Sequence, residues 1–116
     1  MRVINRTAVT ITGAKPYVDW TVRTVADVNK GVITVARAKL YGSAFLLPEF
    51  ELEEDVLEWV EENADWLFEF QLDAWTDDRS TWPETRDLKT FREWFNVDIH
   101  SVVVDVGDDE IEGEEL

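Results

Sequence analysis

The chain has 116 residues, a length typical of one domain with its own hydrophobic core. Six Trp and six Phe, in a composition that is 45% hydrophobic, exclude general disorder. The formal net charge is −15, which disfavours nucleic acid as a direct partner because phosphate would be repelled. The chain contains no cysteine, which excludes disulfides, thiolate metal sites and a cysteine nucleophile.

Charge is divided unevenly along the chain. Residues 1–47 carry seven Lys or Arg and two acids, a balance of +5, whereas residues 48–116 carry four basic residues and 24 acids, a balance of −20. A field of this size selects partners by sign. The first residues lack the apolar core of a signal peptide, and no run of about 18 apolar residues occurs. We therefore expect a cytoplasmic protein without a membrane segment.

The basic part begins with a predicted strand. Residues 7–12 alternate, with Thr7, Val9 and Ile11 on one side, and the strand ends at Gly13. Residues 16–22 could form one or two helical turns because they begin with proline. A loop over 24–32 follows, then a short helix over 35–41, for which a strand is the alternative. Residues 43–47 are apolar and predict a buried strand, which Pro48 halts.

The segment 52–75 predicts a long amphipathic helix. At about 100° per residue, its acids gather on one side and its apolar side chains on the other, so that the apolar face can cover a sheet. The acids of its outer face include Glu58, Glu62 and Asp65. Like charges three and four residues apart repel by a few tenths of a kcal/mol per pair.

The rest of the acidic part divides into four pieces. A polar loop over 76–84 precedes a helix over 86–95, which Thr85 caps. Residues 97–106 predict one strand, and residues 107–116, with six acids, predict a flexible tail.

These elements predict one α+β domain over residues 1–106. Its two layers are a small sheet of about three strands and the helices that cover it, the long acidic helix and a second shorter helix. The strand order is open: a helical connection between the strands 43–47 and 97–106 permits a parallel pairing through a right-handed crossover, and an antiparallel pairing is the alternative.

Three segments resemble, in order and spacing, a family of short uncharacterised bacterial proteins. They are LLPEF at 46–50, STWPETRDL at 80–88 and FREWFNVDIHSVVVDVGDD at 91–109. The resemblance implies a bacterial origin and brings no activity, substrate or catalytic residue.

Two groups of residues are candidates for chemistry or binding. Asp98 and His100, the only histidine, share a face of the predicted strand, and a carboxylate beside an imidazole is part of an acid–base site. Trp82 lies in a polar loop between Arg79 and Arg86, and this combination of tryptophan and arginine is enriched at binding hot spots. The alternative is that Trp82 folds back over the core while both arginines hold the acidic helix by ion pairs.

No metal site or cofactor is predicted. The acids at 73–78 and 105–112 lack the spacing and central glycine of a calcium loop, and no phosphate-binding glycine motif is present.

Three functional hypotheses follow. The first is a small acidic interaction or regulatory protein, without catalytic activity, that docks a basic protein surface through its acidic helix face. The second is an enzyme or ligand-binding protein in which Trp82, Arg86, Asp98 and His100 form a cleft. The third is adaptation to a salt-rich environment, in which case the surface charge specifies no partner.

Overall fold

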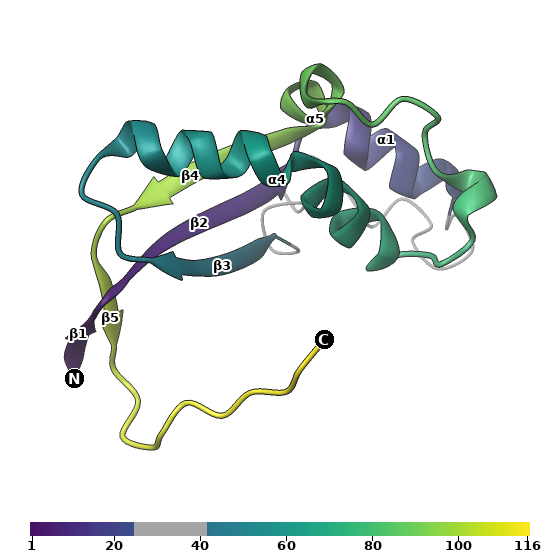
Figure 1. Cartoon of the computed structure of the whole chain (residues 1–116). Helices are drawn as coiled ribbons and strands as arrows, with labels where there is room; N and C mark the ends of the chain where they lie inside the picture. The colour runs from purple at the N-terminus through teal and green to yellow at the C-terminus, as the bar shows by residue number, and fades with distance from the viewer. Residues whose placement is uncertain (25–41) are drawn as a thin grey trace.

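A computed structural model describes residues 1–24 and 42–116 (Figure 1). As predicted, the fold is mixed α+β. The expected helix over 35–41, and all but the first residue of the expected loop over 24–32, lie outside the described residues. The elements in chain order are β1 (Arg2–Ile4), β2 (Arg6–Gly13), α1 (Lys15–Thr24), β3 (Ser43–Pro48), α4 (Glu53–Asp73), the 3-10 turn η2 (Arg79–Thr81), α5 (Leu88–Trp94), β4 (Phe95–His100) and β5 (Val103–Asp105).

In the described part of the chain, the main sheet consists of three antiparallel strands in the order β3-β2-β4. The strands β3 and β4 do not pair with each other, so neither of the two pairings considered for them occurs. Instead β2 lies between them, with Val9 opposite Phe45 on one side and opposite Ile99 on the other. This central position suits β2 because Val9 and Ile11 are fully buried, and both are β-branched residues of the kind enriched in strands.

Helices cover one face of this sheet (Figure 1). Val9, Ile11 and Leu47 of the sheet belong to one buried cluster with the apolar face of α4, whose members are Val56, Val60, Ala64, Leu67 and Phe68. On the other face, Ala44, Leu46, Asp98 and His100 are exposed. The expectation that residues 43–47 form a buried strand is therefore wrong: among the described strands β3 lies at the edge of the sheet, and its residues Ala44 and Leu46 are exposed.

The expected single strand over 97–106 is divided into β4 and β5. Ala8 pairs with His100, and Ile4 pairs with Val103. Between these two pairs lie three residues, 5–7, on the first segment and two residues, 101–102, on the second. One extra residue in a ladder is a bulge, which bends the strands. Beyond it, β5 pairs with β1 in a separate two-stranded sheet that extends past the end of the main sheet (Figure 1).

The second helix is shorter than the expected 86–95, and its cap differs. The Asp87 carboxylate, rather than Thr85, caps α5 by accepting a hydrogen bond from the Thr90 N–H at 2.8 Å. Asp87 also accepts from the Thr90 hydroxyl at 2.7 Å. These two hydrogen bonds from Thr90 lower the pKa of Asp87.

Tyr17 of α1 contacts both the strand β4 and the helix α4. Its ring lies 4.9 Å from that of Phe95, and its hydroxyl donates to the backbone carbonyl of Gln71 at 2.6 Å. A Cβ on Gly13 would lie 2.6 Å from Cδ1 of Tyr17, so the glycine at the end of β2 allows this close packing. Burial raises the pKa of the Tyr17 phenol well above its usual range.

The last ten residues, 107–116, contain no helix or strand and are exposed throughout. In the described part of the chain, no helix has the length and apolar character needed to cross a membrane.

Candidate functional site

The outer surface of α4 carries exposed acids, three of which form no ion pair with any residue in 1–24 or 42–116. Glu58, Glu62 and Asp65, called here the acidic face, are all exposed, and no ion pair with another described residue involves them. Two neighbouring acids differ in this respect. Glu61 pairs with Arg92, and Glu69 lies 3.6 Å from Arg79 and 3.9 Å from Arg86. The described part of the chain therefore supplies no cation that neutralises the acidic face.

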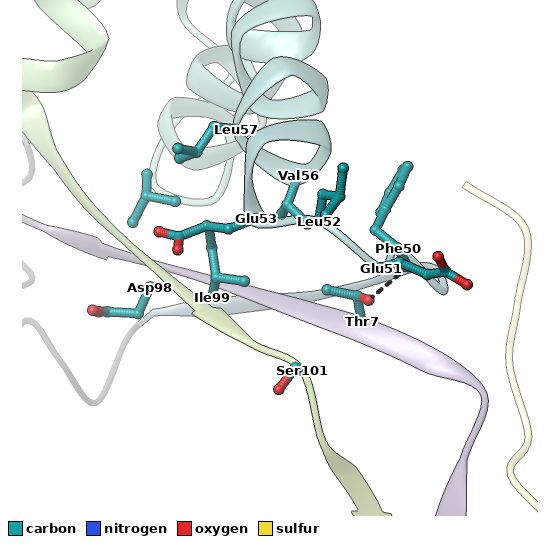
Figure 2. A pocket seen from close by; sticks show the side chains of 11 residues that line it. Thr7, Phe50, Glu51, Leu52, Glu53, Val56, Leu57, Asp98, Ile99 and Ser101 are labelled. Carbon is teal, nitrogen blue, oxygen red and sulfur yellow. Dashed lines mark hydrogen bonds between the residues drawn. The ribbon is translucent and has the colours of Figure 1, made fainter.

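A groove runs beside the acidic face, between α4 and β4. Its larger part has a volume of about 540 Å³ and is lined at the start of α4 by Leu52, Glu53 and Leu57. Figure 2 shows Glu53, Val56 and Leu57 on the helix side and Ile99 on the strand side. A hydrogen bond of 3.1 Å from the Phe50 N–H to the Thr7 hydroxyl holds the segment before α4 against β2.

The groove continues along β4 toward α5. A second hollow of about 220 Å³ shares Leu57 and Val97 with the first and is otherwise lined mainly by apolar side chains, together with the Glu61–Arg92 pair. The two hollows together are called the β4 groove. Its lining is mixed: apolar side chains such as Leu57, Val97 and Ile99 alternate with Thr7, Ser101 and the acids Glu51, Glu53, Glu61 and Asp98.

Asp98 and His100 lie on one face of β4, as predicted, and both are exposed. The His100 ring lies 3.2 Å from the Thr10 hydroxyl of the neighbouring strand, within hydrogen-bond distance. Asp98 stands opposite Thr10 in the strand register. No hydrogen bond or ion pair joins Asp98 to His100 among the interactions of the described residues.

Trp82 is buried, with 6% of its surface exposed, so the exposed aromatic surface considered for it is absent. Its indole N–H donates to the Thr76 carbonyl at 3.0 Å. The guanidinium carbons of Arg79 and Arg86 lie 4.6 and 5.8 Å from its ring centre, and both arginines also reach Glu69. Trp82 thus closes over the core while the arginines connect its loop to α4. This is the alternative given for this loop, and apolar burial explains it.

The four residues considered for an enzyme or ligand cleft form two separate pairs: Arg86 lies against Trp82, and Asp98 shares a face of β4 with His100. Asp98 lines the larger part of the β4 groove, and Arg86 lines a different hollow together with Asp65, Glu69 and Glu84. Neither hollow includes Trp82 or His100. Within the described ranges, no three His, Asp or Glu side chains are placed to hold a metal ion.

The sequence pattern points to the acidic face but not to the β4 groove. The groove depends on the position of β4 at the edge of the sheet and on the place where α4 begins over it. The apolar residues Leu52 and Leu57, which are 55% and 45% exposed, were the available signal, since the helical pattern assigns both to the apolar side.

Comparisons with known proteins add no assignment: no family model, curated protein or solved structure matches this chain. The resemblance of segments 46–50, 80–88 and 91–109 to short bacterial proteins stays a prediction.

Proposed function

We propose that this protein binds a basic partner protein through the acidic face of α4 and acts without catalysis. The observation that carries the proposal is the contrast along one helix. Glu61 and Glu69 are paired with arginines, whereas Glu58, Glu62 and Asp65 remain exposed without a counter-ion among the described residues. Like charges on successive turns destabilise an isolated helix, and a basic partner would relieve that repulsion.

The same proposal places the protein in the cytoplasm, which suits a charged chain without cysteine. A bacterial source is proposed from the resemblance alone. The alternative, an enzyme or ligand site, has less support because Trp82 is buried and Asp98 and Arg86 line different hollows.

The test is a pull-down from a lysate of the source organism with the wild type and a triple variant, Glu58→Gln, Glu62→Gln and Asp65→Gln. We expect the variant to lose the basic partners that the wild type retains at low salt. With a purified partner, the variant should mainly associate more slowly, because long-range attraction between opposite charges accelerates encounter.

A matched control changes three acids of the tail instead, Asp108→Asn, Asp109→Asn and Glu110→Gln. It removes the same number of charges at exposed positions away from α4. The control should recover the same partners as the wild type. Equal recovery by all three proteins, without an effect of salt, would contradict docking through the acidic face.

A further inference from the structure

Among residues 1–24 and 42–116, only β2 pairs with β4, which leaves a second edge of β4, called here the free edge, whose backbone groups can be assigned from the register. Gly13 stands opposite Phe95 in the register. The residue after Gly13, Ala14, donates its N–H to the carbonyl of the residue before Phe95, Trp94, at 2.8 Å. The pair of Gly13 and Phe95 is therefore of the kind that exchanges no hydrogen bonds, and such pairs alternate along an antiparallel ladder with pairs that do.

The alternation fixes which groups face away from β2. Asn96 and Asp98 exchange hydrogen bonds with β2, while Val97 and Ile99 direct their N–H and C=O groups outward. The only strand that pairs with β4 in the described structure is β2, and no hydrogen bond of the described residues outside that ladder uses the backbone of Val97 or Ile99. Unpaired edges of this kind are templates for a further strand.

The side chains of the same two residues face the β4 groove. Val97 and Ile99 line it together with Leu57 of α4. A strand added along this edge would place every second side chain on the groove side, against that apolar wall. The alternate side chains would face the exposed side of the sheet, where Asp98 lies.

Charge decides between possible occupants. Glu51, Glu53 and Asp98 contribute to the lining of the larger hollow. Glu61 of the smaller hollow lies one helical turn from Glu58 and Asp65, so the groove adjoins the acidic face. A second copy of this chain would bring the same acids and another net charge of −15 to the edge, and it is therefore disfavoured.

We infer that the β4 groove binds an extended segment of a partner protein, with alternating apolar and basic residues, as an additional strand on the free edge of β4. The inference rests on the proposed function and specifies the conformation and residue pattern of the partner segment. Backbone pairing with Val97 and Ile99 supplies affinity, and the apolar wall and the acids supply selection.

The experiment uses the full chain and an acetylated, amidated peptide of about seven residues in which lysine and valine alternate, KVKVKVK. Its control has the same composition in blocks, KKVVVKK, and hence the same charge. Affinity is measured by titration, and amide hydrogen exchange is measured residue by residue. We expect the alternating peptide to slow exchange at Val97 and Ile99, whereas the Asp98 and His100 amides, which already bond β2, change little.

The blocked peptide should bind about tenfold more weakly, because it loses the alternation that fits the groove while keeping the charge. Two N-methylated peptides test backbone pairing without altering the protein. One is methylated at its valines and the other at its inner lysines. Only one of these sets of N–H groups faces β4 in a given strand orientation, so one peptide should lose about tenfold in affinity and the other should not.

A variant pair tests the edge from the protein side. Val97→Pro removes an outward N–H that β2 does not use, and an edge strand tolerates proline there. Val97→Thr keeps the N–H and the branched shape. We expect weaker binding of the alternating peptide to Val97→Pro and near-unchanged binding to Val97→Thr. The N-methylated peptides keep the inference testable if the proline variant does not fold.

With the peptides, any of three results would overturn the inference: equal affinity for the alternating and blocked peptides, equal effects of both N-methylations, or unchanged exchange at Val97 and Ile99. Protection of these amides that rises with protein concentration, without peptide, would assign the edge to a second copy and also overturn it. If exchange is unchanged while the acidic-face triple variant still loses its partners, the proposed function stands and only strand addition fails.

Discussion

Folding opposes the ionisation of Tyr17. Its phenol is buried and donates to the Gln71 carbonyl, so the neutral form is favoured and its pKa is raised above the ordinary value of 10.0. In the unfolded chain the phenol ionises near pH 10, whereas in the folded chain the phenol is still protonated at that pH. The stability associated with Tyr17 is therefore present below about pH 10 and is lost as the pH rises above it.

We predict that the free energy of unfolding of the wild type falls between about pH 9 and 11, and that Tyr17→Phe reduces this fall. At pH 8 the variant should be less stable by about 1 kcal/mol, because one hydrogen bond is lost. Urea unfolding at several pH values measures both effects. In Tyr41→Phe, Tyr17 is the only remaining phenol, so phenolate absorbance should rise only as that protein unfolds. Ionisation without unfolding would contradict the prediction.

Trp82 is a core residue, and its replacement should act on stability. We predict that Trp82→Ala lowers the free energy of unfolding by about 3–5 kcal/mol, the usual cost of truncating a buried aromatic residue. Trp66 is the matched control because 43% of its surface is exposed. Trp66→Ala should cost clearly less, and denaturant unfolding compares the two. Equal costs would show that Trp82 does not close over the core.

At the scale of elements, α4 combines a buried apolar side with exposed acids that no described cation pairs with. Glu58 and Glu62 are four residues apart, and Asp65 follows three residues later, so each neighbouring pair repels by a few tenths of a kcal/mol. Salt screens this repulsion over about 10 Å at 0.1 M. The buried side of α4 should be affected much less because it depends on apolar packing.

We predict that the melting temperature rises between low salt and about 0.5 M NaCl. The triple variant of Glu58, Glu62 and Asp65 to Gln should melt higher than the wild type at low salt and respond less to NaCl. Thermal unfolding followed by circular dichroism measures both. A similar change in the tail variant of Asp108, Asp109 and Glu110 would attribute the effect to net charge rather than to the acidic face.

The elements that could be predicted from sequence are those with a complete local pattern. The expected helix over 52–75 corresponds to α4, Glu53–Asp73, because its polar and apolar residues separate so clearly. The expected strand over 7–12 lies within β2, Arg6–Gly13, because alternation and branched residues agree there. The exposure of the acidic face follows from the same helical pattern.

The remaining features depend on contacts between distant segments. The alternation of apolar and polar residues over 97–100 stops at Ser101 and Val102, and the expected strand continued past this change. The break between β4 and β5 depends on the extra residue in the opposing strand near Asn5. The β4 groove likewise depends on strand order, which a single sequence does not encode in its local periodicity. Trp82 had two interpretations because its loop is polar while its ring is apolar.

At the scale of the whole molecule, much of the charge can be separated from the fold. The tail over 107–116 has no helix or strand, and residues 108–116 hold six of the 26 acids. Its removal should relieve repulsion without removing packed side chains.

We predict that a chain truncated after Gly107 unfolds cooperatively and melts at the same temperature as the full chain or slightly higher. Thermal and urea unfolding of both chains provide the measurement. Non-cooperative unfolding of the shorter chain would show that the tail contributes to the fold.

The central position of β2 also has a consequence for the order in which the protein can be made. β2 lies near the N-terminus, but its partner β4 comes late: Thr10 and His100, which lie 3.2 Å apart, are 90 positions apart in the chain. During synthesis β2 leaves the ribosome long before β4. The edge of β2 that pairs with β4 therefore stays unpaired until β4 has been synthesised. Contacts of such separation slow folding and lengthen the exposure of aggregation-prone edges. A nascent chain halted before Phe95 would thus leave the backbone groups of Ala8, Thr10 and Thr12 without their partners in β4, as an unpaired strand edge.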